Sequence, residues 1–247
     1  MKKGEIKRQA LLASAEKLFF TKGYGATSIN DILETLHCSK GSFYHHFTSK
    51  LEVLTALCRQ HAEDAFARYR NDSRDESDAL KRLDLLLYHS LPTVPEETEL
   101  AALLMQLISF PEGEQVLDAL IAAQEKTFFG ELRFLLRSLE EERRAFLPIP
   151  GLVRLIWDTH TALYRRLLLI GADMAADRMP PPGYIGVAET LEAGRYLLER
   201  ALDLPFGSLT IIRAEACLQT LSQAAEKVRA VDPINEETLS GDQLSMF

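Results

Sequence analysis

Hydrophobic residues recur along this chain with the period of an α-helix. Near the start, Leu11, Ala15, Leu18 and Phe19 share one helical face, and comparable stripes return in nearly every later segment. No segment shows a convincing alternation of apolar and polar residues, which would mark a half-buried strand. The pattern therefore predicts an all-α protein in which a small three-helix head is joined by a fourth helix to a larger helical bundle.

Glycines, prolines and capping residues divide this pattern into separate helices. Gly23 and Gly25 end the first helix, His37-Cys38 separates the second from a very short third, and prolines interrupt the later chain. After the first helix, we expect helices at residues 27–36, 39–47, 51–70, 78–90, 97–110, 114–144, 151–176, 187–201 and 214–228.

Charge is distributed unevenly along the 247 residues, whose formal net charge is −8. Residues 1–50 hold eight lysines and arginines against four acids, which leaves −12 on the remaining 197 residues. A basic head on an acidic body suits a protein that turns one end toward phosphates. We expect a DNA-binding head at residues 1–48, a helical bundle at 49–231, and an acidic tail at 232–247.

Composition excludes several other classes of protein. A hydrophobic content of 47% and a charged content of 26% are typical of a globular chain and not of a disordered or collagen-like one. Three scattered cysteines without paired spacing favour a reducing compartment. The longest uncharged apolar run, residues 100–111, is too short to cross a membrane. We expect a cytoplasmic, nucleoid-associated protein.

The sequence contains no convincing catalytic or metal-binding motif. The patterns of serine hydrolases, phosphate-binding loops, dinucleotide-binding folds and zinc proteases do not occur. Cys58 and His61 lie three residues apart on one helix, but two ligands do not make a metal site. A packed thiol beside a surface histidine is the favoured interpretation. We expect no enzyme activity, no cofactor and no metal.

The short third helix has the composition of a DNA-reading element. Two helices separated by two or three residues suit a helix-turn-helix unit, in which Phe43 and Phe47 would pack inward. Gly41 inside a helix costs about 1 kcal/mol relative to Ala, and close approach to a DNA backbone is one reason for it. The side chains expected to face outward can all form hydrogen bonds: Ser39, Lys40, Ser42, Tyr44, His45 and His46.

These outward side chains suit particular parts of DNA. Lys40 can reach a phosphate or a guanine edge, Ser42 a base edge or the backbone, and Tyr44 a phosphate oxygen. Lys50 and the free amides at helix amino termini would add phosphate contacts. The plainer alternative is a small helical cap with a polar outer face.

Two stretches of the head resemble the DNA-binding head of TetR/AcrR-family regulators. They are Gly23-Tyr24-Gly25-Ala26-Thr27-Ser28 and Ser39-Lys40-Gly41-Ser42-Phe43-Tyr44-His45-His46-Phe47-Thr48-Ser49-Lys50. The resemblance implies an all-helical homodimer that binds a palindromic operator, usually as a repressor, and that is released by an effector bound in the larger domain. It implies phosphate contacts from Thr27 or Ser28, Tyr44 and Lys50, and base contacts from Lys40, Ser42, Phe43 and His45.

The turn between the two helices departs from the family pattern. His37-Cys38 stands where the family usually has Gly-Val. Cys38 can fill the apolar position, and histidine is among the residues that tolerate a positive φ. We therefore expect the turn to be kept.

An aromatic stripe in the body is a candidate effector pocket. Trp157, His160 and Tyr164 follow one another at helical spacing, which suits an apolar or cationic ligand with His160 as its polar anchor. Facing helices could add Tyr88, Met105, Phe110 and Phe128. Ordinary core packing around a satisfied histidine is the alternative.

The last helices and the C-terminal residues suggest contacts with other protein chains. In the TetR/AcrR family the late helices pair across the two-fold axis, which makes Leu191, Gly194 and Leu198 dimer candidates; the alternative is that they cover their own bundle. The last five residues resemble the peptide by which bacterial replication proteins bind the sliding clamp, with the contacts expected from Gln243, Leu244, Met246 and Phe247. A second interpretation is therefore a DNA-binding partner of the replication machinery that docks on the sliding clamp.

Overall fold

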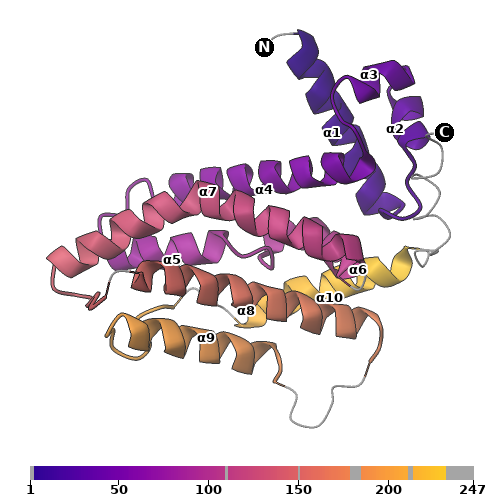
Figure 1. Ribbon diagram of the computed structural model, residues 1–247. Coiled ribbons are helices and arrows are strands. Elements are labelled where there is room, and N and C mark those ends of the chain that lie inside the picture. The colour runs from indigo at the N-terminus through magenta and orange to yellow at the C-terminus, as the bar shows by residue number, and fades with distance from the viewer. Residues whose placement is uncertain (1–2, 109–110, 150, 179–184, 211–213, 232–247) are drawn as a thin grey trace.

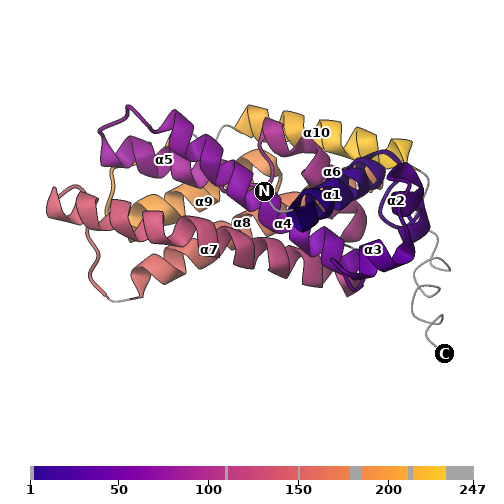
Figure 2. The same ribbon diagram turned by 90° about the horizontal axis from the view of Figure 1, so that it is seen from above.

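The computed structural model describes residues 3–108, 111–149, 151–178, 185–210 and 214–231. Throughout these ranges the regular structure is helical, as the sequence predicts (Figures 1 and 2). The helices are α1 (Lys3–Thr21), α2 (Ile29–Thr35), α3 (Lys40–Tyr44), α4 (Lys50–Asp72), α5 (Ala79–His89), the 3-10 helix η1 (Pro95–Glu97), α6 (Thr98–Leu107), α7 (Pro111–Glu141), α8 (Leu152–Ala175), α9 (Val187–Ala201) and α10 (Ala214–Ala230).

Serine side chains begin the helices of the head. Ser28, Ser39 and Ser49 are the N-caps of α2, α3 and α4, and each hydroxyl accepts a hydrogen bond from a backbone amide in the first turn. At α2 the cap is reciprocal, because the Asp31 carboxylate also accepts from the Ser28 amide at 2.7 Å. Such caps satisfy amides that the helix itself leaves unpaired, so they place the helix starts firmly.

The start of α7 differs from the sequence prediction. The sequence predicts a break at 111–113, yet the helix begins at Pro111, because a proline fits the first helical position, where no amide is needed. Gly113 lies against the backbone at the end of α6, and a Cβ there would overlap the Leu107 carbonyl. The absence of a side chain lets α6 and α7 meet closely.

The head stands at one end of an elongated body (Figure 1). The helix α4 leaves the head and runs along the body beside α7, with α5 packed against both. The helices α6, α8 and α10 form the neighbouring layer, and α9 covers the outside of α8.

Two groups of buried side chains fill the interior. The first is continuous from the head, where Phe19 and Phe43 belong to it, into the adjoining part of the body around Leu104 and Tyr164. The second fills the far part of the body around Trp157. The head therefore shares its core with the body, while the expected boundary near residue 48 stays a prediction.

A polar network also ties the head to the body. His61 on α4 binds Glu16 of α1 through Nε2 at 3.0 Å and Glu97 of η1 through Nδ1 at 2.8 Å. Arg68 pairs with the same buried Glu97 carboxylate. Burial alone would lower the pKa of His61, but the two carboxylates outweigh it and raise the pKa to about 9. A charged imidazole thus holds α1, α4 and η1 together.

Candidate nucleic-acid interface

The turn between α2 and α3 is kept despite its unusual residues. His37 adopts φ 48°, the left-handed conformation that the sequence predicts for it. Cys38 is half-buried and packs against the core of the head. The turn is closed by the Cys38 amide, which donates to the Leu33 carbonyl at 3.1 Å. This geometry sets α3 across the end of α2.

The helix α3 buries one face and exposes the other. Phe43 is fully buried and Phe47 is nearly so, with their rings 5.9 Å apart, as their spacing predicts. On the opposite face Lys40 and His45 are exposed, and Tyr44 is 50% exposed. The two phenylalanines are thus the anchors of a helix too short to be stable alone.

The remaining polar residues of α3 complete this face. Ser42 and His46 are half-buried, while the cap Ser39 is exposed. A Cβ on Gly41 would meet only the Ser39 hydroxyl at 4.0 Å among the described atoms, so no packing inside the head requires glycine there. Space above Gly41 is therefore open to an approaching partner.

Three residues from which the resemblance implies DNA contacts are buried inside the head. Phe43 is buried and cannot touch a base. Thr27 is also buried, and its hydroxyl donates to the Gly23 carbonyl at 2.7 Å. The Lys50 ammonium donates to the carbonyls of Tyr24 and Thr27 at 3.0 and 2.9 Å and lies over the Tyr24 ring. Lys50 is therefore an internal tie between α4 and the turn after α1.

The Ser28 side chain also interacts within the head. Its hydroxyl lies 2.8 Å from the Asp31 carboxylate, which Lys22 also approaches at 2.9 Å. Burial would raise the pKa of Asp31, but Lys22 and Ser28 outweigh it and leave the pKa lowered. Ser28 thus serves first as a helix cap.

The amino-terminal part of α1 is a candidate that the sequence reasoning missed. A Cβ on Gly4 would lie 3.9 Å from the His46 ring, so this end of α1 borders α3. One turn further on, the Arg8 guanidinium lies 5.1 Å from the centre of the Phe47 ring, and Lys7 is half-exposed beside it. The net charge of the head does not tell which of its basic residues lie beside α3. The spacing of Lys7 and Arg8 on α1 is the signal that could have placed them there.

The aromatic stripe of α8 is completely buried. Successive rings of Trp157, His160 and Tyr164 lie 6.0 and 6.3 Å apart. His160 Nε2 bonds the Ser90 hydroxyl at 2.8 Å, and burial lowers the pKa of His160 to about 4. Gln124 on α7 donates to the Ser90 carbonyl.

The other pocket candidates do not form one group with the stripe. Met105 packs in the core nearer the head, where Tyr88 borders it, whereas Phe128 packs in the far core with Trp157. Phe110 lies outside the described residues. The stripe therefore spans the junction of the two cores.

The predicted dimer residues are buried inside the molecule. Leu191, Gly194 and Leu198 face the bundle, and a Cβ on Gly194 would lie 2.7 Å from the Leu163 side chain of α8. The small residue thus serves packing of α9 on α8 within one chain. Their positions agree with the alternative that they cover their own bundle, and a contribution to a dimer stays a prediction.

Two further predictions concern Cys58 and the tail. Burial raises the pKa of the Cys58 thiol to about 12, in keeping with a packed thiol. His61 is no free surface histidine, because both ring nitrogens bind carboxylates. The tail residues Gln243, Leu244, Met246 and Phe247 lie outside the described residues.

A capped α2, a tight turn and a short α3 with an exposed polar face define a helix-turn-helix head of the DNA-binding class. Residues 11–57 match the family described as "Bacterial regulatory proteins, tetR family". Over this stretch the head of the chain is therefore similar to the tetR family.

Individual relatives agree with this assignment. The repressor KstR2 of Mycobacterium tuberculosis (strain CDC 1551 / Oshkosh) is 35% identical over 88 residues, which are 36% of this chain and 44% of KstR2. An uncharacterized HTH-type regulator of Lactococcus lactis subsp. lactis is 40% identical over 72 residues, which are 28% of this chain and 37% of that protein. The chain thus spans less than half the length of these relatives.

The body shares its fold with solved regulators. FadR from Bacillus subtilis, solved with stearoyl-CoA, superposes with a TM-score of 0.52 at 14% identity, covering 78% of this chain and 97% of FadR. At this identity the likeness concerns the fold alone.

None of the helices within the described ranges is long and apolar enough to cross a membrane.

Proposed function

We propose that the protein is a transcriptional regulator that binds double-stranded DNA through its head and acts as a repressor. The observation that carries this proposal is the exposed polar face of α3, held in place by Phe43 and Phe47. Lys40, Tyr44 and His45 project from this face. The family match of residues 11–57 and the repressors among its relatives support the same function.

The side chains of α3 have separate roles in this proposal. Lys40 and His45 read base edges in the major groove, and the Tyr44 hydroxyl donates to a phosphate. Lys7 and Arg8 at the start of α1 add positive charge beside the same groove. Lys50, Thr27 and Phe43 act indirectly, by keeping the head in shape.

The test is a selection of random DNA sequences by the purified protein, followed by fluorescence anisotropy on the enriched site. We expect Lys40→Ala to cost about 1–3 kcal/mol of binding free energy, either with relaxed preference at one base or with a salt slope reduced by about 1. Tyr44→Phe weakens binding without changing the preferred sequence. Lys126→Ala, on the exposed side of α7, is the control. No enriched sequence, or wild-type binding by both head variants, contradicts the proposal.

We also propose that the regulator is a dimer paired through α8 and α9. Large apolar side chains are exposed on both helices: Leu155 and Leu169 on α8, and Tyr196 and Leu197 on α9. A two-fold dimer would place two heads on half-sites about 34–36 Å apart, as palindromic operators require. Exposed apolar side chains gathered on neighbouring helices are typical of such interfaces.

Light scattering after gel filtration tests the pairing. We expect the wild type to be a dimer and the Leu155→Glu/Leu197→Glu variant to be a monomer, because each buried carboxylate would lack a partner. Leu218→Glu, on the exposed face of α10, is the matched control and stays dimeric. A monomeric wild type contradicts the proposal, and a monomeric control moves the interface to α10.

We propose that an effector binds beside the aromatic stripe of α8. Four buried polar atoms there have no hydrogen-bond partner among the described residues: Trp157 Nε1, His160 Nδ1, Tyr164 Oη and Gln124 Oε1. An unpaired buried polar group costs about 1–3 kcal/mol, so a hydrogen-bonding molecule that reaches these atoms would be favoured. Burial keeps both His160 and Tyr164 uncharged, the first by a lowered and the second by a raised pKa. The effector is therefore a neutral molecule with both donors and acceptors.

Tryptophan fluorescence can follow this binding directly. Trp157 is the single tryptophan of the chain and is fully buried, so its emission reports the stripe. A library of neutral small molecules is screened for a change in emission, and each hit is tested for release of DNA. His160→Phe is expected to weaken binding of such a ligand, whereas Thr159→Val, at the half-buried neighbouring position, is the control and is expected to leave it unchanged. Hits that bind His160→Phe as well as wild type would contradict this site.

A further inference from the structure

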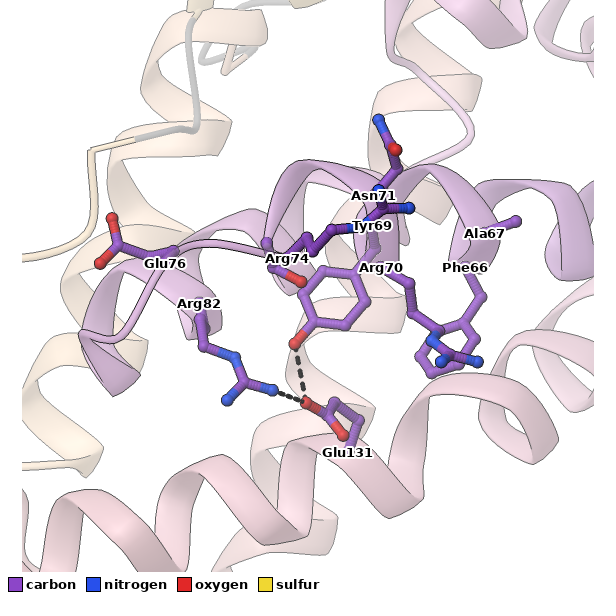
Figure 3. Close-up of a pocket in the computed structure, with 10 residues that line it drawn as sticks. Phe66, Ala67, Tyr69, Arg70, Asn71, Arg74, Glu76, Arg82 and Glu131 are labelled. Carbon is purple, nitrogen blue, oxygen red and sulfur yellow. Dashed lines mark hydrogen bonds and ion pairs between the residues drawn. The ribbon is translucent and has the colours of Figure 1, made fainter.

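The far end of the body contains an open hollow that the proposed function does not use. It has a volume of about 830 Å³ and is lined by residues from the end of α4, the start of α5 and α7. Figure 3 shows the side chains that line it. This volume is in the range of small-molecule sites. The hollow is distinct from the α8 stripe, none of whose residues lines it.

The floor of the hollow is a closed hydrogen-bond group. The Tyr69 hydroxyl donates to Glu131 at 2.9 Å, and Arg82 approaches the same carboxylate oxygen at 2.5 Å, as Figure 3 shows. Burial and then Glu131 raise the pKa of Tyr69 to about 12, so the hydroxyl stays a donor. The negative charge of Glu131 is therefore already matched by Arg82. The Nε of Arg82 is buried and has no partner among the described residues.

Two more arginines border the hollow without a counter-charge. Arg70, in the last turn of α4, and Arg74, just beyond that helix, are exposed and form no ion pair with any described residue. The other lining acid, Glu76, accepts from the Asp78 amide at 2.9 Å and lies 3.5 Å from Lys81. A cation at a helix carboxyl end interacts favourably with the helix dipole, which accounts in part for Arg70. Arg74 has no such role.

Apolar surface complements this excess of positive charge. Phe66 lines the hollow beside Tyr69, their ring centres 5.5 Å apart, and the Phe66 ring is partly exposed. Guanidinium groups bind carboxylates and phosphates through paired hydrogen bonds, while an aromatic wall favours a planar or apolar ligand body. A purely hydrocarbon ligand would leave the arginines without a partner.

We propose that this hollow binds a small organic anion, whose phosphate or carboxylate group is held by Arg70 and Arg74 and whose aromatic or apolar part lies against Phe66. The site is independent of DNA binding by the head, so it stands or falls separately from the proposed function.

Isothermal titration of the full-length protein, at constant ionic strength and without DNA, tests the site. The probes are phenyl phosphate, benzoate and inorganic phosphate, with sodium chloride as the blank. We expect phenyl phosphate to bind, and the Arg70→Gln/Arg74→Gln variant to bind it at least about tenfold more weakly, since each charge-assisted hydrogen bond contributes more than a neutral one. Phe66→Leu should narrow the difference between phenyl phosphate and inorganic phosphate.

The matched control is Arg133→Gln/Arg137→Gln, which removes two exposed arginines of α7 that do not line the hollow. It should bind the probes as the wild type does. Stronger binding of benzoate than of phenyl phosphate, which carries the same ring, would identify a carboxylate ligand, and the reverse a phosphate ligand; either supports the site. No heat from any probe up to about 10 mM, or equal binding by the Arg70→Gln/Arg74→Gln variant, overturns it.

Discussion

Lys50 allows a direct comparison of two roles for one side chain. A phosphate contact and an internal tie predict different results for Lys50→Met, which keeps the length and apolar stem of the side chain but removes the ammonium. In the structure the ammonium donates to the carbonyls of Tyr24 and Thr27, and its side chain is buried. The variant should therefore destabilise the head and leave the electrostatics of DNA binding unchanged.

The size of the effect follows from these contacts. A hydrogen bond from a charged donor contributes about 1.5–3 kcal/mol, and a cation over a ring adds about 0.5–2 kcal/mol. Releasing the ammonium from burial offsets part of the loss, so we expect a net cost of roughly 2–4 kcal/mol. Since about 1.4 kcal/mol is a factor of ten, opening of the head should become at least roughly thirtyfold more frequent.

Amide hydrogen exchange read by mass spectrometry measures this opening in the peptides that contain Tyr24 and Thr27. Lys40→Met is the matched control, because Lys40 is exposed and should leave exchange unchanged while altering DNA binding. The salt dependence of DNA binding should keep its slope in Lys50→Met. A slope lowered by about 1, with wild-type exchange, would refute the internal tie and restore Lys50 as a phosphate contact.

The remaining predictions concern the joint between head and body and the packing of α7. The pKa of His61 is raised from 6.5 to about 9, so its stabilisation is complete below pH 6.5 and is lost as the pH rises toward 9. Urea unfolding should therefore show a wild-type advantage over His61→Gln of about 3 kcal/mol at pH 6 that falls steeply by pH 9.5; a constant difference would contradict it. Gly113→Ala should lower the melting temperature, at a cost of about 1–3 kcal/mol, because its Cβ meets the Leu107 backbone. Gly130→Ala in the same helix meets nothing within 4 Å and should stabilise by about 1 kcal/mol, so equal signs for the two would refute the packing argument.

Local signals in the sequence are sufficient to predict the helices and the turn between α2 and α3. Glycine breaks and capping residues act over a few residues, and the helices of the head begin at serine caps of this kind, Ser28, Ser39 and Ser49. The positive φ of His37 follows from the same short-range logic. The all-α fold follows from periodicity repeated over many segments.

Contacts between segments far apart in the sequence could not be predicted from such local signals. An apolar stripe on α9 indicates a buried face but not what covers it, and Leu163 of the same chain turns out to lie against Gly194. The hollow is formed by Tyr69, Arg82 and Glu131, whose closeness depends on how three helices pack. No spacing in the sequence expresses that arrangement.

The charge of the head shows why location matters more than a total. The sequence gives residues 1–50 a formal net charge of +4, but Lys50 is buried and Lys22 forms an ion pair with Asp31. Among the described side chains, the basic groups next to α3 are then Lys7, Arg8 and Lys40. Attraction to DNA depends on charges within about one Debye length of the phosphates, roughly 8–10 Å at moderate salt. The −12 carried by the rest of the chain therefore repels DNA weakly at the head, because the body extends away from it, and an acidic protein can still present a basic surface at one end.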